Sequence, residues 1–441
     1  MIPFPRLSAA STWVKKLREH RQLLAAVAVG VLNQAVSSGT NFLFSLYLVH
    51  ELSPNEFGLY GIGFACLLFF GGVVGALFLM QMVLHAPGKA ETDQESYAGR
   101  ILVMVVVFAV AWVGIGSLVG IGIAHAAPNL AIYGWLYLAT LAGSASYALK
   151  EYCVRYAYCR RREVVALKVN CMIAGGLFIA MFLLKSNGYA LNAATAMFAY
   201  AIAHLTGSIP VLAKGIPAGL AGSMRRLRDD FSELRTGGLW ATLSFLVYFV
   251  RMQAHTIITS ATMGPTGVAA LNASRIYVTP AMILTPTMSQ LAMPRMASAA
   301  ANGTLRPARG SLLLSALLLT VTLVYGVFIW SLFEPISKGV TGHQYGDIGW
   351  LVFFWMLYAG VLALRNAAEI GVQVLQNQRL LALLNGMSMV ISMLAVSVLV
   401  HWFTVIGAVL GLVVGELVLL FFLWRVLLLN GSYSEVFREE L

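Results

Sequence analysis

Residues 239–261, LWATLSFLVYFVRMQAHTIITSA, are apolar enough to cross a membrane, yet they place Arg251 near their middle and His255 one turn later. A spanning helix needs about 20 mostly apolar residues. A charged side chain at that depth costs about 2.5–3.5 kcal/mol on insertion scales, so it normally faces a partner, a ligand or a water-filled cavity. The stretch therefore predicts a membrane helix with a functional polar face.

Polar residues recur every three or four positions along this stretch: Ser244, Tyr248, Arg251, His255 and Thr259. That spacing brings helical side chains to one face. After the turn 263–266, a second apolar stretch repeats the pattern with Asn272, Arg275 and Thr279. We interpret the two stripes as the cationic wall of a transport cavity. They supply five candidate substrate-binding residues: Tyr248, Arg251, His255, Asn272 and Arg275.

The rest of the chain is equally apolar. Of its residues 59% are hydrophobic and 11% charged, with a mean hydropathy of +0.80, which excludes an ordinary soluble domain. Twelve stretches are long enough to span, at about 23–49, 59–84, 101–124, 131–149, 169–184, 191–213, 239–261, 267–292, 311–333, 348–366, 381–400 and 406–429. The predicted class is an all-α polytopic membrane protein.

Basic residues give the orientation. The net charge is +11, yet only Lys185 and Lys338 among the 29 lysines and arginines fall in the loops on one side of the predicted spans. The positive-inside rule then places both termini in the cytoplasm. The basic loops are expected to face anionic membrane lipids rather than nucleic acid.

Four further sites carry polar or charged groups within spans or at their ends. The first span holds Asn33, Gln34 and Asn41, which either bond to neighbouring helices or line a wet cavity and contact substrate. His204 either bonds within the helix bundle or carries a proton. Glu416 is a candidate for ion coupling, a counter-charge, or a structural hydrogen bond. Arg365 and Glu369, four residues apart, predict a local ion pair.

The two halves resemble each other. Lys150 precedes Asn170 by the same interval as Arg365 precedes Asn385. Internal duplication is common in transporters, where the binding site lies between the repeats. The predicted organisation is a basic amphipathic segment (1–22), a first lobe (23–213), a basic linker (214–238), a second lobe (239–429) and a cytoplasmic tail (430–441).

Several stretches resemble the polysaccharide flippases of the multidrug/oligosaccharidyl-lipid/polysaccharide exporter superfamily, and the resemblance covers nearly the whole chain. They are Asn33-Gln34 through Asn41-Phe42-Leu43, the segment 52–60 (LSPNEFGLY), the segment 263–270 (MGPTGVAA), Pro294, and the segment 405–409 (VIGAV) leading to Gly415-Glu416.

The resemblance implies twelve helices in two pseudo-symmetric six-helix lobes around a central cavity, working by alternating access. It also implies a bacterial inner-membrane flippase that moves a polyprenyl-diphosphate-linked oligosaccharide, a repeat unit of surface polysaccharide or exopolysaccharide, to the outer leaflet. Relatives that flip the cell-wall lipid precursor tend to carry a charge in the first span, where this chain has only amides. That departure argues against the cell-wall precursor as cargo.

Two rival functions follow from other features. A cation-coupled multidrug exporter of the same architecture would need acids in spans 1, 7 and 8, which hold none. A glycan polymerase or glycosyltransferase would need a substantial loop or domain for acid/base groups, and none is long enough, so we predict that the chain is not an enzyme.

No cofactor or metal is expected. The chain has no G-x-x-x-x-G-K-[ST] loop for ATP, and its four cysteines lack metal-site spacing. Other polysaccharide-assembly proteins are the expected protein partners.

Overall fold

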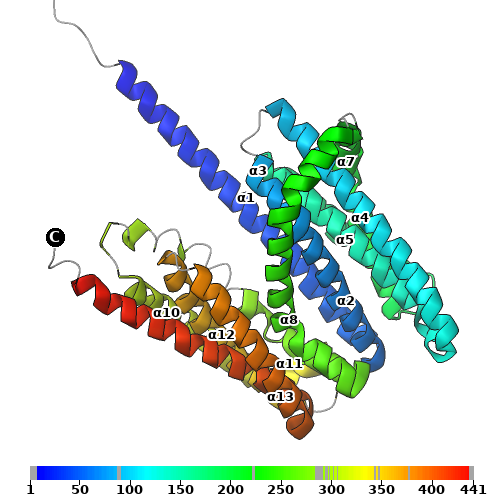
Figure 1. The fold of residues 1–441 in the computed structure, drawn as a ribbon. Coiled ribbons are helices and arrows are strands. Elements are labelled where there is room, and N and C mark those ends of the chain that lie inside the picture. The colour runs from blue at the N-terminus through cyan, green and yellow to red at the C-terminus, as the bar shows by residue number, and fades with distance from the viewer. Residues whose placement is uncertain are drawn as a thin grey trace, which may run out of the picture. The chain divides into compact units, whose positions relative to one another are not determined.

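A computed structural model describes residues 7–86, 91–220, 224–283, 292–293, 296, 298–300, 302–304, 306–341, 344–345, 348–375 and 378–436 (Figure 1). Within these ranges the regular structure is entirely helical. Five sequence predictions lie wholly or partly outside the described residues: the start of the N-terminal segment (1–6), part of the basic linker (221–223), the end of span 8 (284–291), the family-motif residue Pro294, and the end of the C-terminal tail (437–441).

The elements follow the predicted spans. Their bounds are α1 (Leu7–Glu51), α2 (Pro54–Val74), η1 (Gly75–Leu79), α3 (Met80–His85), α4 (Glu91–Ala126), η3 (Pro128–Tyr133), α5 (Gly134–Cys159), α6 (Glu163–Ser186), α7 (Ala193–Leu220), α8 (Met224–Ile276), α10 (Pro307–Ser331), α11 (Phe333–Val340), α12 (Gly349–Val374) and α13 (Gln378–Val436).

Seven described helical stretches are long and apolar enough to cross a membrane. Their large apolar side chains are widely exposed, as Val110 on α4 and Val324 on α10 show, each at 66%. A water-soluble fold would not leave such long apolar faces uncovered, whereas lipid covers them in a bilayer. The chain is therefore an integral membrane protein.

Two helices contain a break that divides them into two spans. In α8 the break is Gly264, whose φ of 68° is readily adopted only by glycine, and Pro265 follows it. This confirms the turn predicted at 263–266. In α13 the break is Thr404, with φ 51°, between the eleventh and twelfth predicted spans.

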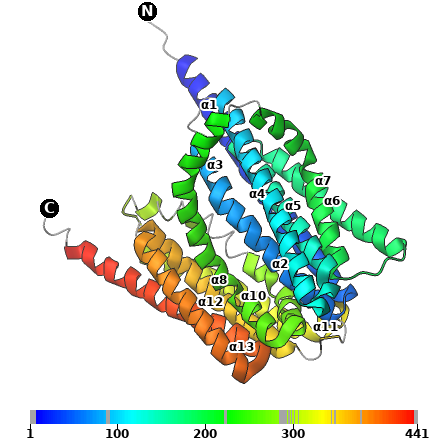
Figure 2. The ribbon, with the colours of Figure 1, turned by 45° about the vertical axis from the view of Figure 1, so that its right-hand side comes forward.

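The chain divides into two compact units. Unit 1 comprises 1–43, 70–190 and 194–241, and within it α5 packs against both α4 and α6 (Figure 2). A buried ion pair between Arg100 of α4 and Asp230 of α8 adds to its contacts.

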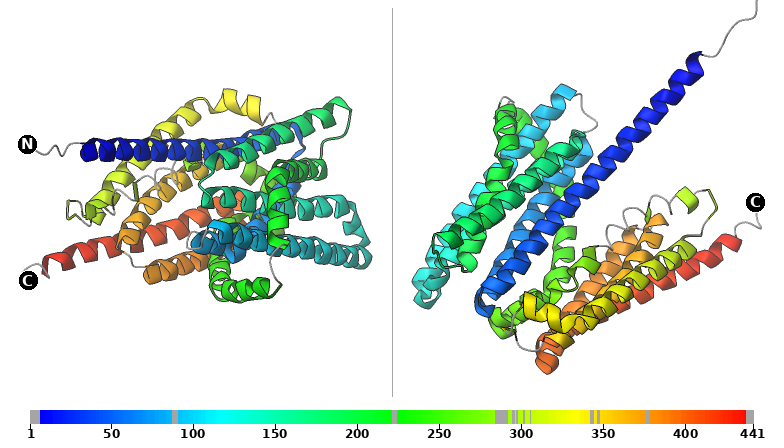
Figure 3. Two further views of the ribbon diagram at one scale, coloured as in Figure 1. Left: turned by 90° about the horizontal axis from the view of Figure 1, so that it is seen from above. Right: turned by 180° about the vertical axis from the view of Figure 1, so that it is seen from behind.

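Unit 2 comprises 44–69, 191–193 and 242–441, and α12 packs against α10 and α13 (Figure 3). One of its cores is formed by α12 and α13, with Val372, Leu419 and Leu423 fully buried. The passage from unit 1 to unit 2 along α8 falls between Ala241 and Thr242. The lobe bounds proposed from the sequence stay a prediction.

Glycines at every fourth position, Gly407, Gly411 and Gly415, bring the second half of α13 against its first half. A Cβ on Gly415 would lie 1.7 Å from the Ser392 hydroxyl. Small residues at this spacing allow helix backbones to approach closely. This contact fixes the position of the neighbouring residue, Glu416.

Candidate functional site

The polar stripe of α8 is buried within unit 2 from Arg251 onward. Arg251 is 4% exposed, His255 2% and Thr259 0%. Because these residues are four apart on a regular helix, they share one face, as their spacing predicts. Tyr248, one turn before Arg251, is half exposed, and its ring centre lies 6.0 Å from the guanidinium carbon.

Much of this stripe lacks hydrogen-bond partners. Among the described residues, nothing bonds Arg251 Nε, either ring nitrogen of His255, or the Thr259 hydroxyl, although all are buried. Buried polar groups are normally satisfied, because leaving one unpaired costs about 1–3 kcal/mol. Three such side chains in succession indicate a face that is completed by water or by a ligand.

Arg251 has one polar partner in the described chain. Its Nη1 donates to Oδ1 of Asn385 on α13, and the Asn385 amide nitrogen donates in turn to the Leu381 carbonyl at 2.9 Å. The partner of this buried guanidinium is thus a neutral amide.

Trp355 of α12 contacts residues of α8 on both sides of its break at Gly264. Its ring meets the His255 imidazole edge-on, with centroids 5.5 Å apart, and lies 5.7 Å from the Arg275 guanidinium carbon. Its indole N–H donates to Ser274 at 3.1 Å. The structure therefore brings Arg251, His255 and Arg275 to one region of unit 2. Sequence reasoning missed Trp355, because one aromatic residue in an apolar span gives no signal.

The arginines of unit 2 differ in whether a carboxylate lies beside them. No carboxylate in the described residues lies within 4 Å of Arg251 or Arg275, whereas Arg365 pairs with two carboxylates, Glu369 and, at 2.8 Å, Glu416. This confirms the predicted pair between Arg365 and Glu369. It also favours the counter-charge interpretation of Glu416 over the other two, and a coupling role for that residue stays a prediction.

Asn272, in the second half of α8, lies against α2. Its amide rests against Gly61 of α2, where a Cβ would come within 2.2 Å of Nδ2. Asn272 is partly buried. Its predicted contact with substrate is untested.

The amides of α1 belong to unit 1. Asn33 is buried and has both amide groups engaged, because it donates to the Tyr158 hydroxyl at 2.8 Å and accepts from Asn170 at 2.7 Å. Gln34 donates to Ser38 on the exposed side of the helix, and Asn41 accepts from the Tyr200 hydroxyl at 3.2 Å. Asn33 therefore links helices in this structure. Substrate contacts by the three amides stay predictions.

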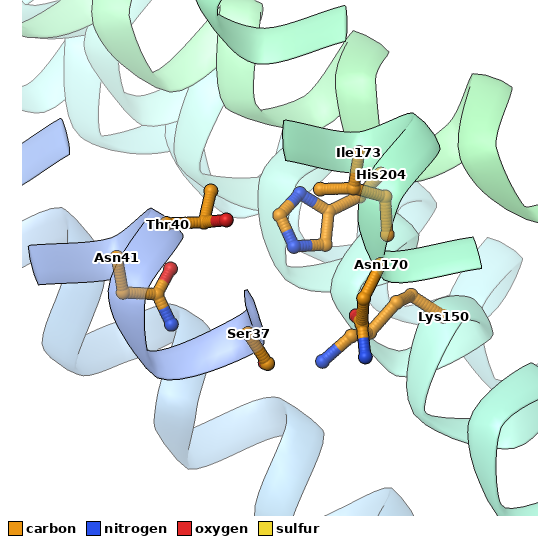
Figure 4. Close-up of a pocket in the computed structure, with 7 residues that line it drawn as sticks. All are labelled: Ser37, Thr40, Asn41, Lys150, Asn170, Ile173 and His204. Carbon is orange, nitrogen blue, oxygen red and sulfur yellow. The ribbon is translucent and has the colours of Figure 1, made fainter. Parts of the chain in front are cut away.

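A small polar cavity of about 10 Å³ lies within unit 1 (Figure 4). Side chains of α1 face those of α5, α6 and α7 across it, and its lining consists of Ser37, Thr40, Asn41, Lys150, Asn170, Ile173 and His204. A space of this size holds about one water molecule. His204 bonds the Tyr200 carbonyl of its own helix at 2.8 Å. A role for His204 in ion coupling is untested.

Lys150 differs from its expected position. The predicted span 131–149 ends just before it, which would leave it in a cytoplasmic loop, but α5 continues to Cys159 and Lys150 is buried at 6% exposure. Glu151 makes this possible, because its carboxylate lies 2.9 Å from the ammonium. A charge that is paired in this way can be buried at lower cost.

No protein-family model and no curated protein matches the chain. Solved structures do. The chain resembles an inward-facing multidrug resistance MATE family transporter of the MOP superfamily, with TM-score 0.72 and 11% identity, over 92% of this chain and 99% of that one. It also resembles the lipid II flippase MurJ in an inward closed conformation, with TM-score 0.70 and 12% identity, over 90% of this chain and 86% of that one.

A third similar structure is a mutant of the Vibrio cholerae MATE transporter VcmN, with TM-score 0.59 and 14% identity, over 94% of this chain and 98% of that one. At these identities the likeness concerns the fold. It confirms the predicted fold class, twelve helices in two lobes. Multidrug resistance transporters and a lipid II flippase share this fold, so the fold does not select the substrate.

Proposed function

We propose that the protein is a flippase for a polyprenyl-diphosphate-linked oligosaccharide, a repeat unit of surface polysaccharide or exopolysaccharide. One observation carries the proposal: Arg251 and Arg275 lie in one region of unit 2 with no carboxylate within 4 Å in the described chain. Buried charges are normally paired. Arg251 is buried and Arg275 partly buried, and two such cations without a counter-charge favour an anionic ligand.

A diphosphate meets this requirement. Guanidinium groups bind phosphate oxygens through short, charge-assisted and often bidentate hydrogen bonds. The unbonded Nε of Arg251 and the unbonded imidazole of His255 provide further groups for the same ligand. Because the diphosphate cannot cross hydrocarbon unaided, a polar face inside the membrane is what its transfer requires.

The other parts of such a substrate have different needs. Sugar hydroxyls need hydrogen-bonding side chains, for which Tyr248, Asn272, Gln34 and Asn41 are the proposed residues. The polyprenyl tail remains in lipid, where each buried methylene contributes about 0.8 kcal/mol. Only the head group then has to move between leaflets.

Transfer runs from the inner to the outer leaflet of the bacterial cytoplasmic membrane, with both termini in the cytoplasm. The polar face of α8 is exposed alternately to the two sides of the membrane. Glu416 and His204 are the residues through which an ion gradient could act, and other polysaccharide-assembly proteins are the proposed partners.

A multidrug exporter is the second candidate, because the fold resembles a multidrug transporter as closely as it resembles a flippase. A binding site for cationic drugs needs negative charge. In unit 2 the buried carboxylate Glu416 is paired with Arg365, whereas Arg251 and Arg275 have no carboxylate within 4 Å among the described residues, which favours the flippase.

A direct comparison of cargo tests the proposal. The purified protein is reconstituted in liposomes, and the movement of a fluorescent polyprenyl-diphosphate disaccharide is measured beside the efflux of tetraphenylphosphonium, a lipophilic cation. Protein-dependent movement of the diphosphate lipid alone is expected. Efflux of the cation without flipping of the lipid would establish the exporter instead.

A further inference from the structure

The sequence repeat places one asparagine at the same point of each half. Asn170 of α6 follows the buried Lys150 by the same interval as Asn385 of α13 follows the buried Arg365. In the structure each asparagine bonds to the first helix of its half. Asn170 donates to Asn33 of α1, and Asn385 accepts from Arg251 of α8.

The two contacts differ in charge. In the first half an amide meets an amide, so this point of the fold is satisfied by a neutral pair. In the second half the partner of the asparagine is a guanidinium, that of Arg251. The asparagine is bonded to a neutral amide in one half, so a cationic partner is not needed to satisfy it in the other.

The hydrogen-bond partner of Arg251, the Asn385 amide, leaves its positive charge uncompensated. Oδ1 of Asn385 accepts one hydrogen bond and carries no negative charge, and Arg251 Nε has no partner in the described chain. A carboxylate at the same position would form an ion pair with the guanidinium. Glu416, a buried carboxylate of the same unit, forms its ion pair with Arg365 instead.

We propose that Asn385 is a specificity-determining residue of the α8 site: it holds Arg251 by one hydrogen bond and leaves the guanidinium charge uncompensated for an anionic substrate group. This inference rests on the proposed function. It adds that the amide at residue 385 selects for anions, because an acid there would supply an internal competitor for Arg251.

The test compares Asn385→Asp with Asn385→Ala. Binding of tritiated farnesyl diphosphate to the purified protein in detergent is measured by scintillation proximity, with unlabelled farnesol as the uncharged competitor. Thermal unfolding is followed on the same samples. Asp keeps the acceptor in place and adds a charge, whereas Ala removes the acceptor and adds none.

The proposal predicts that Asn385→Asp binds farnesyl diphosphate about tenfold more weakly or worse, with thermal stability retained. Asn385→Ala is expected to lose less affinity, because Arg251 keeps its free charge. A merely structural role predicts the reverse order, since Asp replaces the hydrogen bond and Ala does not. Wild-type affinity in Asn385→Asp, or its failure to fold, would overturn the inference.

Two controls separate this inference from the proposed function. Asn170→Asp makes the same substitution at the repeat-related position, where the asparagine donates to a neutral amide and holds no guanidinium, and the folded variant is expected to keep its affinity within about twofold of wild type. Arg251→Gln copies the neutral pair of the first half and is expected to fold and lose diphosphate binding.

Arg251→Gln and Asn385→Asp together distinguish failure of the proposed function from failure of the inference about Asn385. If Arg251→Gln binds normally, the anion site itself is wrong and the proposed function fails with it. If Arg251→Gln loses binding while Asn385→Asp keeps it, only the inference about Asn385 fails. If Arg251→Gln does not fold, the charge serves packing and the inference is overturned.

Discussion

Replacing Glu416 by glutamine tests the buried charge arrangement of unit 2. The Glu416 carboxylate lies 2.8 Å from Arg365 Nε, and the two side chains are 3% and 6% exposed. Breaking a fully buried pair costs about 3–5 kcal/mol when it leaves an uncompensated charge. Here Arg365 keeps its second partner, Glu369, which is 20% exposed.

Glu416→Gln is therefore expected to lower the free energy of unfolding by less, about 1.5–3 kcal/mol, which is the contribution of a hydrogen bond to a charged group. Glu369→Gln is the matched control, with an expected cost of about 0.3–1 kcal/mol, because its carboxylate is nearer to solvent. The double variant is expected to lose about 3–5 kcal/mol, because Arg365 is then unpaired.

Thermal unfolding in detergent, followed by tryptophan fluorescence, ranks the three variants. The reasoning fails if Glu416→Gln is as stable as wild type, or if Glu369→Gln is the more damaging change. Wild-type stability of Glu416→Gln together with loss of an ion-gradient response would assign Glu416 to coupling.

Two further substitutions test the site and the fold. Trp355→Leu removes the ring beside Arg275, so we expect weaker transport from the loss of a contact worth about 0.5–2 kcal/mol; unchanged flipping in liposomes would contradict that role. Gly415→Ala should destabilise the protein by about 1–3 kcal/mol, because its Cβ would meet the Ser392 hydroxyl, whereas Gly386→Ala has open space. Equal melting temperatures for the two alanine variants would refute the glycine contact in α13.

The sequence predicts most of the fold, because long apolar stretches and basic loops follow directly from bilayer physics. The polar stripe of α8 is equally visible, since its spacing alone places Arg251 and His255 on one face. The break at Gly264 could be predicted because glycine followed by proline interrupts a helix.

Partners across helices are not predictable in this way. The contact between Arg251 and Asn385 depends on how α8 packs against α13, and no local pattern encodes it. The burial of Lys150 escapes prediction because its ion-pair partner, Glu151, is adjacent in the sequence, and two neighbouring charges are typical of a loop. Trp355 and the repeat-related bond between Asn33 and Asn170 likewise appear only in three dimensions.

The central claim, that α8 binds a diphosphate through its arginines, is tested most directly by lipid flipping in liposomes. Wild type is compared with Arg251→Ala, Arg275→Ala and Arg251→Lys, each verified as folded. We predict that the wild-type protein flips the fluorescent polyprenyl-diphosphate disaccharide and that both alanine variants do not, while activity in the lysine variant would show that a point charge suffices. Normal flipping by folded Arg251→Ala and Arg275→Ala would contradict the claim.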